Sequence, residues 1–372
     1  MRDRIKKKRI PEEHAVNLDD EARRRGVKLR ILVTRLRYLG DVILTTPAVA
    51  ALKERYPEAE IHYAAERPYA DILEGNPDLT SIIRLSRDTR KVPGEIATIR
   101  SLHCTACIDL FYNPRSALLL YLSGIPIRVG GTEKIRGRLY THRFTIPAET
   151  RSAILHHVSA MGVFDVGRRD SLPRVYLTRD EIASGRELLD RVVGGREAGS
   201  RIIAMHPGGT WQSKRWPGRS FAKLALLARE RIGARVVVVT GPGEEGTAER
   251  VRAEAGSAVR VLPFQPLRTI AAVLASCDGV VANDGGIMHL AVAIGRPTVA
   301  VFGPTEPDIW FPYEGRGPFA LVSRRMDCAP CHRHRCEGLE CLEGIEPEDV
   351  LARIREVLAW REPASPGEIS GA

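Results

Sequence analysis

The chain has 372 residues, of which 44% are apolar and 27% are charged, a composition that indicates a folded globular protein and excludes a disordered chain. Its length is sufficient for two domains of ordinary size. The formal net charge is +10. The longest apolar runs, such as 117–122, are far shorter than the roughly 20 residues of a membrane-spanning helix.

Residues 1–28 form a basic N-terminal arm, since residues 1–30 contain eleven Lys and Arg against six Asp and Glu. The arm lacks the apolar segment of a signal peptide, so we expect a cytoplasmic protein. We interpret the arm as a solvated tail. A second interpretation lets it rest on the inner face of the cytoplasmic membrane, where each basic group contributes about 1 kcal/mol. No nucleic-acid-binding motif accompanies the charge, so we expect no nucleic acid partner.

Between residues 29 and 165, short β-rich runs alternate with helical patterns, which predicts βαβ units and a parallel sheet. The predicted strands are 30–36, 60–65, 81–85, 106–111 and 127–131. The predicted helices are 47–56, 68–75, 115–123 and 151–164. The polar stretch 166–180 is expected to be a linker.

The turn after the first predicted strand contains Gly40 followed at once by Asp41. Nucleotide-binding folds usually place glycines at this turn, so that backbone N–H groups approach a phosphate. A carboxylate would repel a phosphate, so the turn predicts a different task for Asp41.

Residues 181–372 repeat the alternation with clearer signals. The predicted strands are 201–209, 234–243, 258–264, 279–286 and 297–305. The predicted helices are 218–231, 244–255, 267–276, 286–294 and 347–361. The expected fold class is therefore α/β, with two doubly wound, Rossmann-like parallel-sheet domains that face a shared cleft.

Three glycine-bearing loops of the second domain are candidates for a diphosphate site. The loop in "HPGGTWQSKRWP" contains Lys214, which could neutralise a departing diphosphate, or could be an ordinary surface cation. The loop in "TGPGEE" contains Glu244, which could bind ribose hydroxyls or could simply begin a helix.

The third loop, "NDGGIMH", ends a strand at Asp284 and opens a helix at Gly285 and Gly286. Free N–H groups at a helix start bind anions, and His289 could donate to a phosphate oxygen. Alternatively, the glycines make a tight turn and His289 packs in the core.

Neither G-x-G-x-x-G nor G-x-x-x-x-G-K-[ST] occurs in full, which argues against a nicotinamide enzyme and a P-loop NTPase. We therefore expect the second domain to bind a diphosphate-containing donor and the first domain to bind a partner substrate.

Four cysteines near the C-terminus have the spacing C-x₂-C-x₄-C-x₄-C. They are Cys328, Cys331, Cys336 and Cys341. Four soft ligands in so short a span could hold a structural zinc ion, although the gaps are tighter than in ordinary zinc fingers. Reduced thiols that stabilise a loop are the alternative.

The motifs "GDVILTTPAVAALKERYP", "HPGGTWQSKRWP" and "NDGGIMHLAVAIGRPTVAVFGPTEP" resemble those of glycosyltransferase family 9, which contains the ADP-heptose:lipopolysaccharide heptosyltransferases. The resemblance covers roughly residues 29–355 and implies a GT-B architecture with an acceptor-binding first domain and a donor-binding second domain. It implies inverting transfer of heptose from ADP-heptose to the lipopolysaccharide inner core. No cofactor or catalytic metal is implied.

Residue by residue, the resemblance makes Asp41 the catalytic base and Lys214 a contact of the donor phosphates. It places the donor-binding turn at Asp284, Gly285, Gly286 and His289, while Glu244 matches a ribose-binding acid only loosely. A lipopolysaccharide or other lipid-linked saccharide acceptor is anionic, so cations of the first domain are candidate contacts: Arg67, Arg136 and Arg138.

Two alternatives to this function stay open, and a third is disfavoured. The enzyme could use another nucleotide sugar or acceptor, or the GT-B fold could serve a nucleotide-sugar epimerase. A non-catalytic adaptor is disfavoured, because Asp41, Lys214 and Asp284 are all present.

Overall fold

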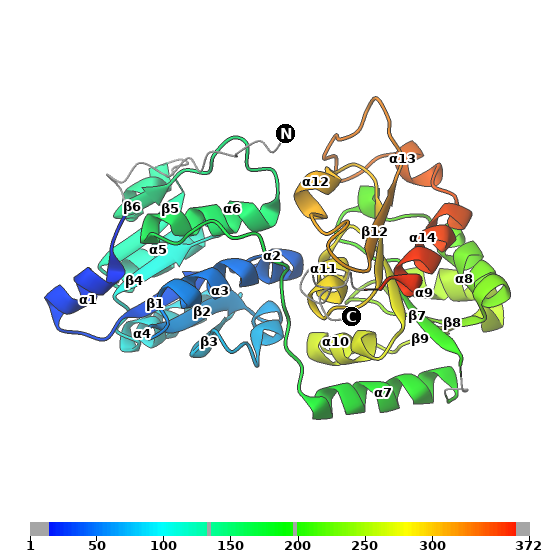
Figure 1. The fold of residues 1–372 in the computed structure, drawn as a ribbon, viewed down its shortest axis with the longest axis horizontal. Coiled ribbons are helices and arrows are strands. Elements are labelled where there is room, and N and C mark those ends of the chain that lie inside the picture. The colour runs from blue at the N-terminus through cyan, green and yellow to red at the C-terminus, as the bar shows by residue number, and fades with distance from the viewer. Residues whose placement is uncertain (1–14, 132–134, 196–198, 362–372) are drawn as a thin grey trace, which may run out of the picture. The chain divides into compact units, whose positions relative to one another are not determined.

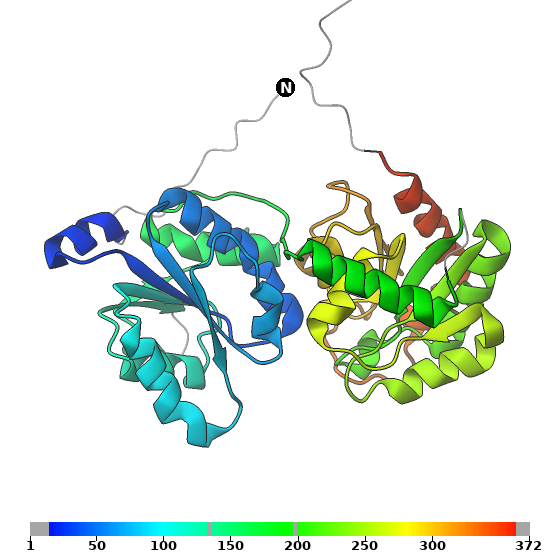
Figure 2. The ribbon, with the colours of Figure 1, turned by 90° about the horizontal axis from the view of Figure 1, so that it is seen from below.

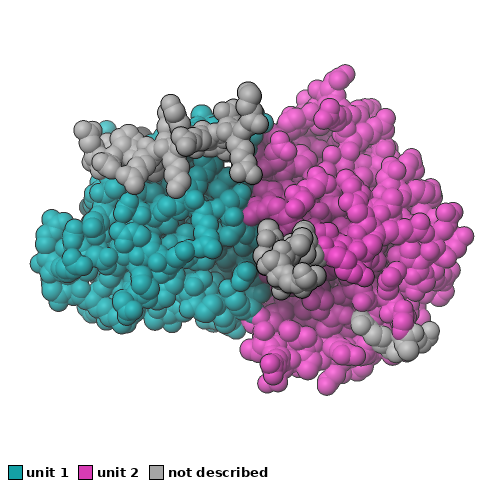
Figure 3. Space-filling view, viewed as in Figure 1, with its two compact units in different colours: residues 1–176 teal, residues 177–372 magenta. Residues whose placement is uncertain are grey.

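The computed structural model describes residues 15–131, 135–195 and 199–361 and divides the chain into two compact units, 1–176 and 177–372 (Figure 3). The division falls inside the stretch 166–180 that was expected to be a linker. No helix in the described ranges has the length and apolar character needed to cross a membrane.

Unit 1 is built from helices and strands in alternation (Figure 1). Its α-helices are α1 (Leu18–Arg25), α2 (Leu39–Leu44), α3 (Thr46–Arg55), α4 (Val92–Ser101), α5 (Pro114–Leu122) and α6 (Ala153–Ala160). Its strands are β1 (Arg30–Thr34), β2 (Glu60–Glu66), β3 (Ser81–Leu85), β4 (Ala106–Asp109), β5 (Ile127–Gly131) and β6 (His142–Phe144).

Unit 2 follows the same plan. Its α-helices are α7 (Arg179–Val193), α8 (Gly218–Ile232), α9 (Glu245–Ala255), α10 (Leu267–Ala275), α11 (Gly286–Ala293), α12 (Pro307–Trp310), α13 (Glu340–Glu343) and α14 (Pro347–Ala359). Its strands are β7 (Arg201–His206), β8 (Ala234–Val238), β9 (Val259–Val261), β10 (Gly279–Asn283), β11 (Thr298–Phe302) and β12 (Phe319–Ser323).

Both sheets are parallel and have the same strand order. In unit 1 the order is β3-β2-β1-β4-β5-β6, and in unit 2 it is β9-β8-β7-β10-β11-β12. The strand order therefore reverses between β1 and β4 in one unit and between β7 and β10 in the other. In doubly wound folds, ligands bind beyond the carboxyl ends of the strands at this switch point.

Helices cover both faces of each sheet, which is why the central strands are apolar throughout. In unit 2, α8, α9 and α14 lie on one face, and α7, α10 and α11 lie on the other (Figures 1 and 2). In unit 1, α4 and α5 pack together on one face, whereas α2, α3 and α6 pack together on the other. The apolar residues of β7, β10 and β11 are fully or almost fully buried, so the sheet of unit 2 holds its carboxyl edge on a rigid support.

Several features differ from the sequence-based expectations, and helices α1, α2, α4 and α7 were not predicted. The predicted helix at 68–75 is a 3₁₀ helix, Tyr69–Leu73, and β12 was not predicted. The structure also contains a 3₁₀ turn at Ile135–Leu139 and strand β6, where the sequence predicted no helix or strand. Such short edge elements carry little periodicity of their own.

The predicted N-terminal arm is partly folded. Helix α1 lies within it, because the Asn17 side chain accepts hydrogen bonds from the backbone N–H groups of Asp19 and Asp20, and Leu18 and Ala22 are buried. Residues 1–14, which carry much of the predicted basic charge, lie outside the described residues.

Candidate functional site

The carboxyl edge of the sheet in unit 2 carries three loops that follow β7, β10 and β11. Asn283, the last residue of β10, joins two of them. Its side-chain amide donates to the carbonyls of Pro207 and Gly208 at 3.0 and 2.9 Å, and its Oδ1 accepts from the N–H of Trp216 at 3.1 Å. One buried amide therefore fixes both ends of the loop that contains Lys214.

Lys214 and Asp284 form an ion pair at the switch point of this sheet. Lys214 Nζ lies 2.6 Å from Asp284 Oδ2, and the side chains are 15% and 3% exposed. The Thr305 hydroxyl, from the loop after β11, donates to the same oxygen at 2.5 Å. A carboxylate buried to this degree needs such partners, because an unpaired buried charge is costly.

The start of α11 follows Asp284 directly. Gly285 has a φ of 175°, an extended conformation that any residue adopts, and a Cβ there would make only ordinary contact with the Asn283 carbonyl at 3.8 Å. The fold itself therefore does not require glycine at this position. Without a side chain, the backbone N–H groups of Gly285 and Gly286 stay accessible to an anion at the positive end of the helix.

His289 lies one turn further along α11 and is buried. Its Nδ1 lies 2.8 Å from the Tyr313 hydroxyl, with the two rings in an edge-to-face arrangement. Burial raises the pKa of Tyr313, so the phenol stays protonated. The structure thus brings His289 to Tyr313, and a contact with the donor stays a prediction.

Glu244 connects the loop after β8 to the loop after β7. Its carboxylate lies 3.0 Å from His206 Nε2 and accepts from the N–H groups of Gly209 and Gly241 at 2.8 and 2.7 Å. Burial alone raises the pKa of Glu244, but these bonds outweigh it and lower the pKa to about 2. A Cβ at Gly208 would overlap the carboxylate, so that glycine serves the close approach of Glu244.

Asp41 lies in unit 1, in the first turn of α2, just beyond the carboxyl end of β1. Its Oδ1 is 2.6 Å from Arg35 Nη2, and its Oδ2 accepts from the N–H of Tyr38 at 3.1 Å. Arg35 also donates to the carbonyl of Leu110 at 2.8 Å and lies over the Phe111 ring. Arg35 was not predicted as a site residue, although its position directly after β1 could have indicated one.

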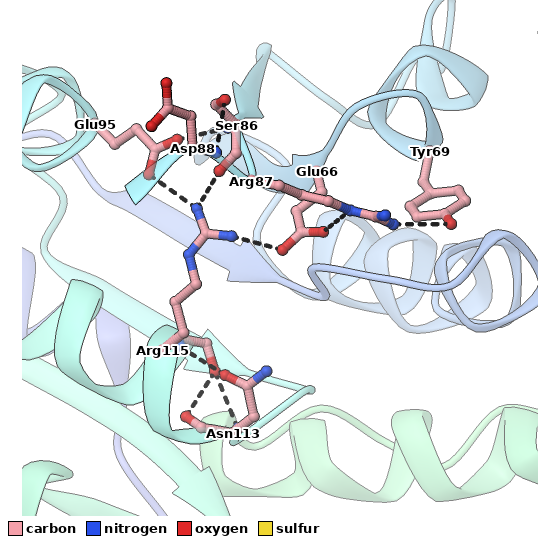
Figure 4. A network of polar contacts seen from close by, with 9 residues as sticks. Glu66, Tyr69, Ser86, Arg87, Asp88, Glu95, Asn113 and Arg115 are labelled. Atoms are coloured by element: carbon pink, nitrogen blue, oxygen red, sulfur yellow. Dashed lines mark hydrogen bonds and ion pairs between the residues drawn. The ribbon is translucent and has the colours of Figure 1, made fainter. Parts of the chain in front are cut away.

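A second polar cluster, formed by Glu66, Arg87 and Arg115 with their neighbours, lies at the carboxyl edge of the unit 1 sheet (Figure 4). Glu66 ends β2, is 3% exposed and binds Arg115 Nη1 at 2.7 Å and Arg87 Nε at 3.0 Å. Arg87 also donates to the Tyr69 hydroxyl at 3.2 Å. The hydrogen bond to Glu66 raises the pKa of Arg87.

Arg115 opens α5 and extends the same cluster. It donates to the Ser86 carbonyl and contacts Glu95 at 3.2 Å, while the carboxylate of Glu95 accepts from the Ser86 N–H (Figure 4). This cluster was not predicted from the sequence, although an acid that ends a buried strand is a usable signal. Arg87 is therefore a cation that Glu66 holds in place, while 57% of its side chain remains exposed.

The predicted acceptor contacts occupy different settings. Arg67 and Arg138 are exposed, Arg67 directly after β2 and Arg138 in the 3₁₀ turn that precedes β6. Arg136 is half-buried and donates from Nε to the Tyr112 carbonyl. Arg136 is therefore engaged in holding its own loop.

The four cysteines become progressively more buried along the chain. Cys328 is exposed, Cys331 and Cys336 are half-buried and Cys341 is buried. Burial, with a smaller effect of the other three thiols, raises the pKa of Cys341. Among the described residues, no group of three or more His, Cys, Asp or Glu side chains is arranged to hold a metal ion, so the candidate zinc site gains no geometric support.

Comparison with known proteins places these features in a family. The model of glycosyltransferase family 9 (heptosyltransferase) matches residues 96–341. Lipopolysaccharide heptosyltransferase 1 of Pseudomonas aeruginosa is 26% identical over 324 residues, 83% of this chain and 87% of the relative.

Solved structures show the same architecture. The family 9 glycosyltransferase of Veillonella parvula aligns with a TM-score of 0.77 and 25% identity, over 89% of this chain and 97% of that one. The ADP-heptose lps heptosyltransferase II of Escherichia coli aligns with a TM-score of 0.74 and 21% identity, over 89% and 98%. These similarities confirm the expected fold class, GT-B with two Rossmann-like α/β units.

Proposed function

Because this chain belongs to glycosyltransferase family 9, the heptosyltransferase family, we propose that it transfers heptose from ADP-heptose to the inner core of lipopolysaccharide. The relatives named for lipopolysaccharide and for ADP-heptose support this choice of acceptor and donor. Within the molecule, one observation carries it: the Lys214–Asp284 pair at the start of α11.

Donor binding is assigned to unit 2. An ammonium group has three N–H donors, so Lys214 keeps its bond to Asp284 while it contacts a phosphate oxygen. The N–H groups of Gly285 and Gly286 bind the other oxygens, and charge that develops on the leaving diphosphate is stabilised without a divalent cation. His289 supports α11 from the buried side, next to Tyr313.

Glu244 is the proposed ribose contact. Its two oxygens already accept three hydrogen bonds, but a carboxylate has about four acceptor positions, so one position remains for a hydroxyl. The pKa of about 2 means that the group accepts and does not donate at neutral pH.

Asp41 is the proposed general base. As the acceptor oxygen forms its bond to the anomeric carbon, its proton moves to the Asp41 carboxylate, and the bond to the diphosphate breaks with the electron pair leaving on ADP. Attack opposite the leaving group inverts the anomeric configuration. Arg35 and the Tyr38 N–H hold the carboxylate in one orientation before the acceptor arrives.

The acceptor is anionic, which suits the cations of unit 1. Arg67 and Arg138 are exposed and available, and Arg87, fixed by Glu66, adds a third cation at the sheet edge. We assign Arg136 a weaker contact, since it already binds Tyr112. A lipid-linked acceptor also implies peripheral contact with the cytoplasmic face of the inner membrane, in a cytoplasmic enzyme.

The test of this function is turnover of ADP-heptose with isolated core acceptor. ADP release that depends on the acceptor supports transfer. Epimerised donor without acceptor would instead assign the fold to an epimerase, and turnover only with another nucleotide sugar or acceptor would correct the substrates.

The first prediction concerns Asp41→Asn. We expect transfer to fall by about 10²–10⁴-fold, because the proton of the acceptor hydroxyl loses its base, while the affinity for ADP stays near the wild-type value. The matched control is Asp20→Asn, since Asp20 occupies the same position in the first turn of α1. An Asp41→Asn enzyme that keeps most of its activity excludes this residue as the base.

A further inference from the structure

The segment Cys328–Cys341, here named the cysteine-rich segment, has no part in the function proposed above. We propose that this segment positions Lys214 for the donor diphosphate. This proposal rests on the donor site proposed above. Within the segment, His334 acts through Trp211 and is a positioning residue. The contacts that carry this role all lie within unit 2.

The cysteine-rich segment holds the loop of Lys214 through four contacts. The Ser213 N–H donates to the His334 carbonyl at 3.2 Å, and the Ser213 hydroxyl donates to the Arg333 carbonyl. The Cys336 N–H donates to Gln212 Oε1 at 3.2 Å. The rings of Trp211 and His334 stack with centroids 3.9 Å apart and an interplanar angle of 24°.

These contacts bear on the lysine itself. Lys214 Nζ lies 4.5 Å from the centroid of the Trp211 ring and 5.9 Å from that of Trp310. An ammonium group over an indole face is attracted by the ring quadrupole. The stack with His334 fixes the plane of Trp211, and this plane limits where the ammonium group can lie.

The same segment also holds the loop after β11. The N–H groups of Cys331 and His332 both donate to the Pro304 carbonyl, at 3.0 and 3.1 Å, and His332 Nε2 lies 2.7 Å from Glu306 Oε2. Pro304 and Glu306 flank Thr305, whose hydroxyl binds Asp284. One surface segment therefore supports both partners of Asp284, Lys214 and Thr305.

The physical consequence is preorganisation of the phosphate site. A lysine side chain is flexible, and each rotamer lost on binding reduces affinity. Because the stack already restricts Lys214 in the free protein, this conformational entropy is lost when the protein folds and not when the donor binds. Removal of the stack should weaken diphosphate binding while acceptor binding in unit 1 stays unchanged.

The test compares His334→Ala with His334→Phe, which keeps a flat ring for Trp211. For His334→Ala we expect the Kd for ADP and the KM for the donor to rise about 5–10-fold, with an unchanged KM for the acceptor. His334→Phe should restore both values. Arg335→Ala, a change of an exposed side chain in the same segment, is the control and should match the wild type.

A second variant guards against misfolding of the first. Trp211→Leu removes the stack from the other side, and the double variant should be no worse than the poorer single variant, because both act through one contact. ADP affinity unchanged in His334→Ala, an additive double variant or failure of His334→Phe to restore binding would each overturn the positioning role. A wild-type protein that does not bind ADP would instead refute the proposed donor, and the positioning role with it.

Discussion

Two carboxylates, buried Asp284 and half-buried Glu244, organise the candidate donor site, and each has hydrogen-bonding partners from another loop. Asp284 has Lys214 and Thr305, and Glu244 has His206 with two backbone N–H groups. Burial of a charge is tolerated only when hydrogen bonds replace the lost water. The groups proposed to bind the donor therefore also fix the ends of β7, β8, β10 and β11.

The second prediction follows from the pKa of Glu244. Because the pKa falls from 4.5 to about 2 on folding, its contribution to stability is fully present above pH 4.5 and is lost as the pH falls through 2. At about 1.4 kcal/mol per pKa unit the contribution is about 3 kcal/mol. We expect the urea midpoint of the wild type to fall more steeply between pH 4.5 and 2 than that of Glu244→Gln.

Tryptophan fluorescence suits this measurement, because all four tryptophans of the chain lie in unit 2: Trp211, Trp216, Trp310 and Trp360. Glu245→Gln, at the exposed neighbouring acid, is the control. Parallel curves for the wild type and Glu244→Gln would mean that the hydrogen bonds of Glu244 do not stabilise the folded unit.

At the scale of elements, a glycine makes a close contact between two helices of unit 2. Gly185 of α7 lies so near α10 that an added Cβ would overlap the backbone of Ala272. Gly246, in the first turn of α9, would meet nothing within 4 Å. The two glycines therefore have opposite effects on stability. Gly185 permits close helix packing, whereas Gly246 only lowers the helix propensity of α9.

The third prediction uses this pair. Gly185→Ala should lower the free energy of unfolding of unit 2 by about 1–3 kcal/mol, because α7 must move away from α10. Gly246→Ala should leave it unchanged or raise it by about 0.5–1 kcal/mol. Urea unfolding followed by tryptophan fluorescence measures both. Equal stabilities of the two variants would contradict close packing at Gly185.

At the scale of the whole molecule, two units with their own sheets and cores divide the proposed work. The residues assigned to the donor come from unit 2, and Asp41 and the candidate acceptor cations come from unit 1. A ligand that binds one folded unit stabilises that unit by mass action.

The fourth prediction is that ADP changes amide hydrogen exchange mainly in unit 2. Protection should increase at 207–216, 284–289, 303–306 and 328–341, since these loops surround Lys214 and Asp284. The segment 30–44 of unit 1, which contains Asp41, should change little with ADP alone. Protection that appears in 30–44 but not around Lys214 would mean that ADP binds unit 1, and it would contradict the proposed donor site in unit 2.

The sequence predicted most of the framework, because alternating apolar runs and turn residues are local signals. Of the twelve strands in the described part of the chain, ten lie within or overlap predicted ranges, and the two that were missed, β6 and β12, are edge strands. Helices α4 and α7 were missed as well; the first residues of α4 include Pro93 and Gly94, and burial of Ile99 supports it. Local propensity is weak where tertiary burial decides.

The partners of the site residues were not predictable in this way. Lys214 and Asp284 were each identified by their loops, but their 2.6 Å contact depends on β7 and β10 being neighbours. Arg35 with Asp41, and Glu66 with Arg87 and Arg115, likewise pair through strand order or turn geometry.

The sequence alone thus determined the class of fold, the two-unit plan and the loops to which we assign the chemistry. The tertiary structure alone decided which charges meet, and that Glu244 and His289 are held by internal hydrogen bonds. The reason is physical: strands and turns arise from neighbours in the chain, whereas ion pairs at a sheet edge arise from long-range burial that orders the strands.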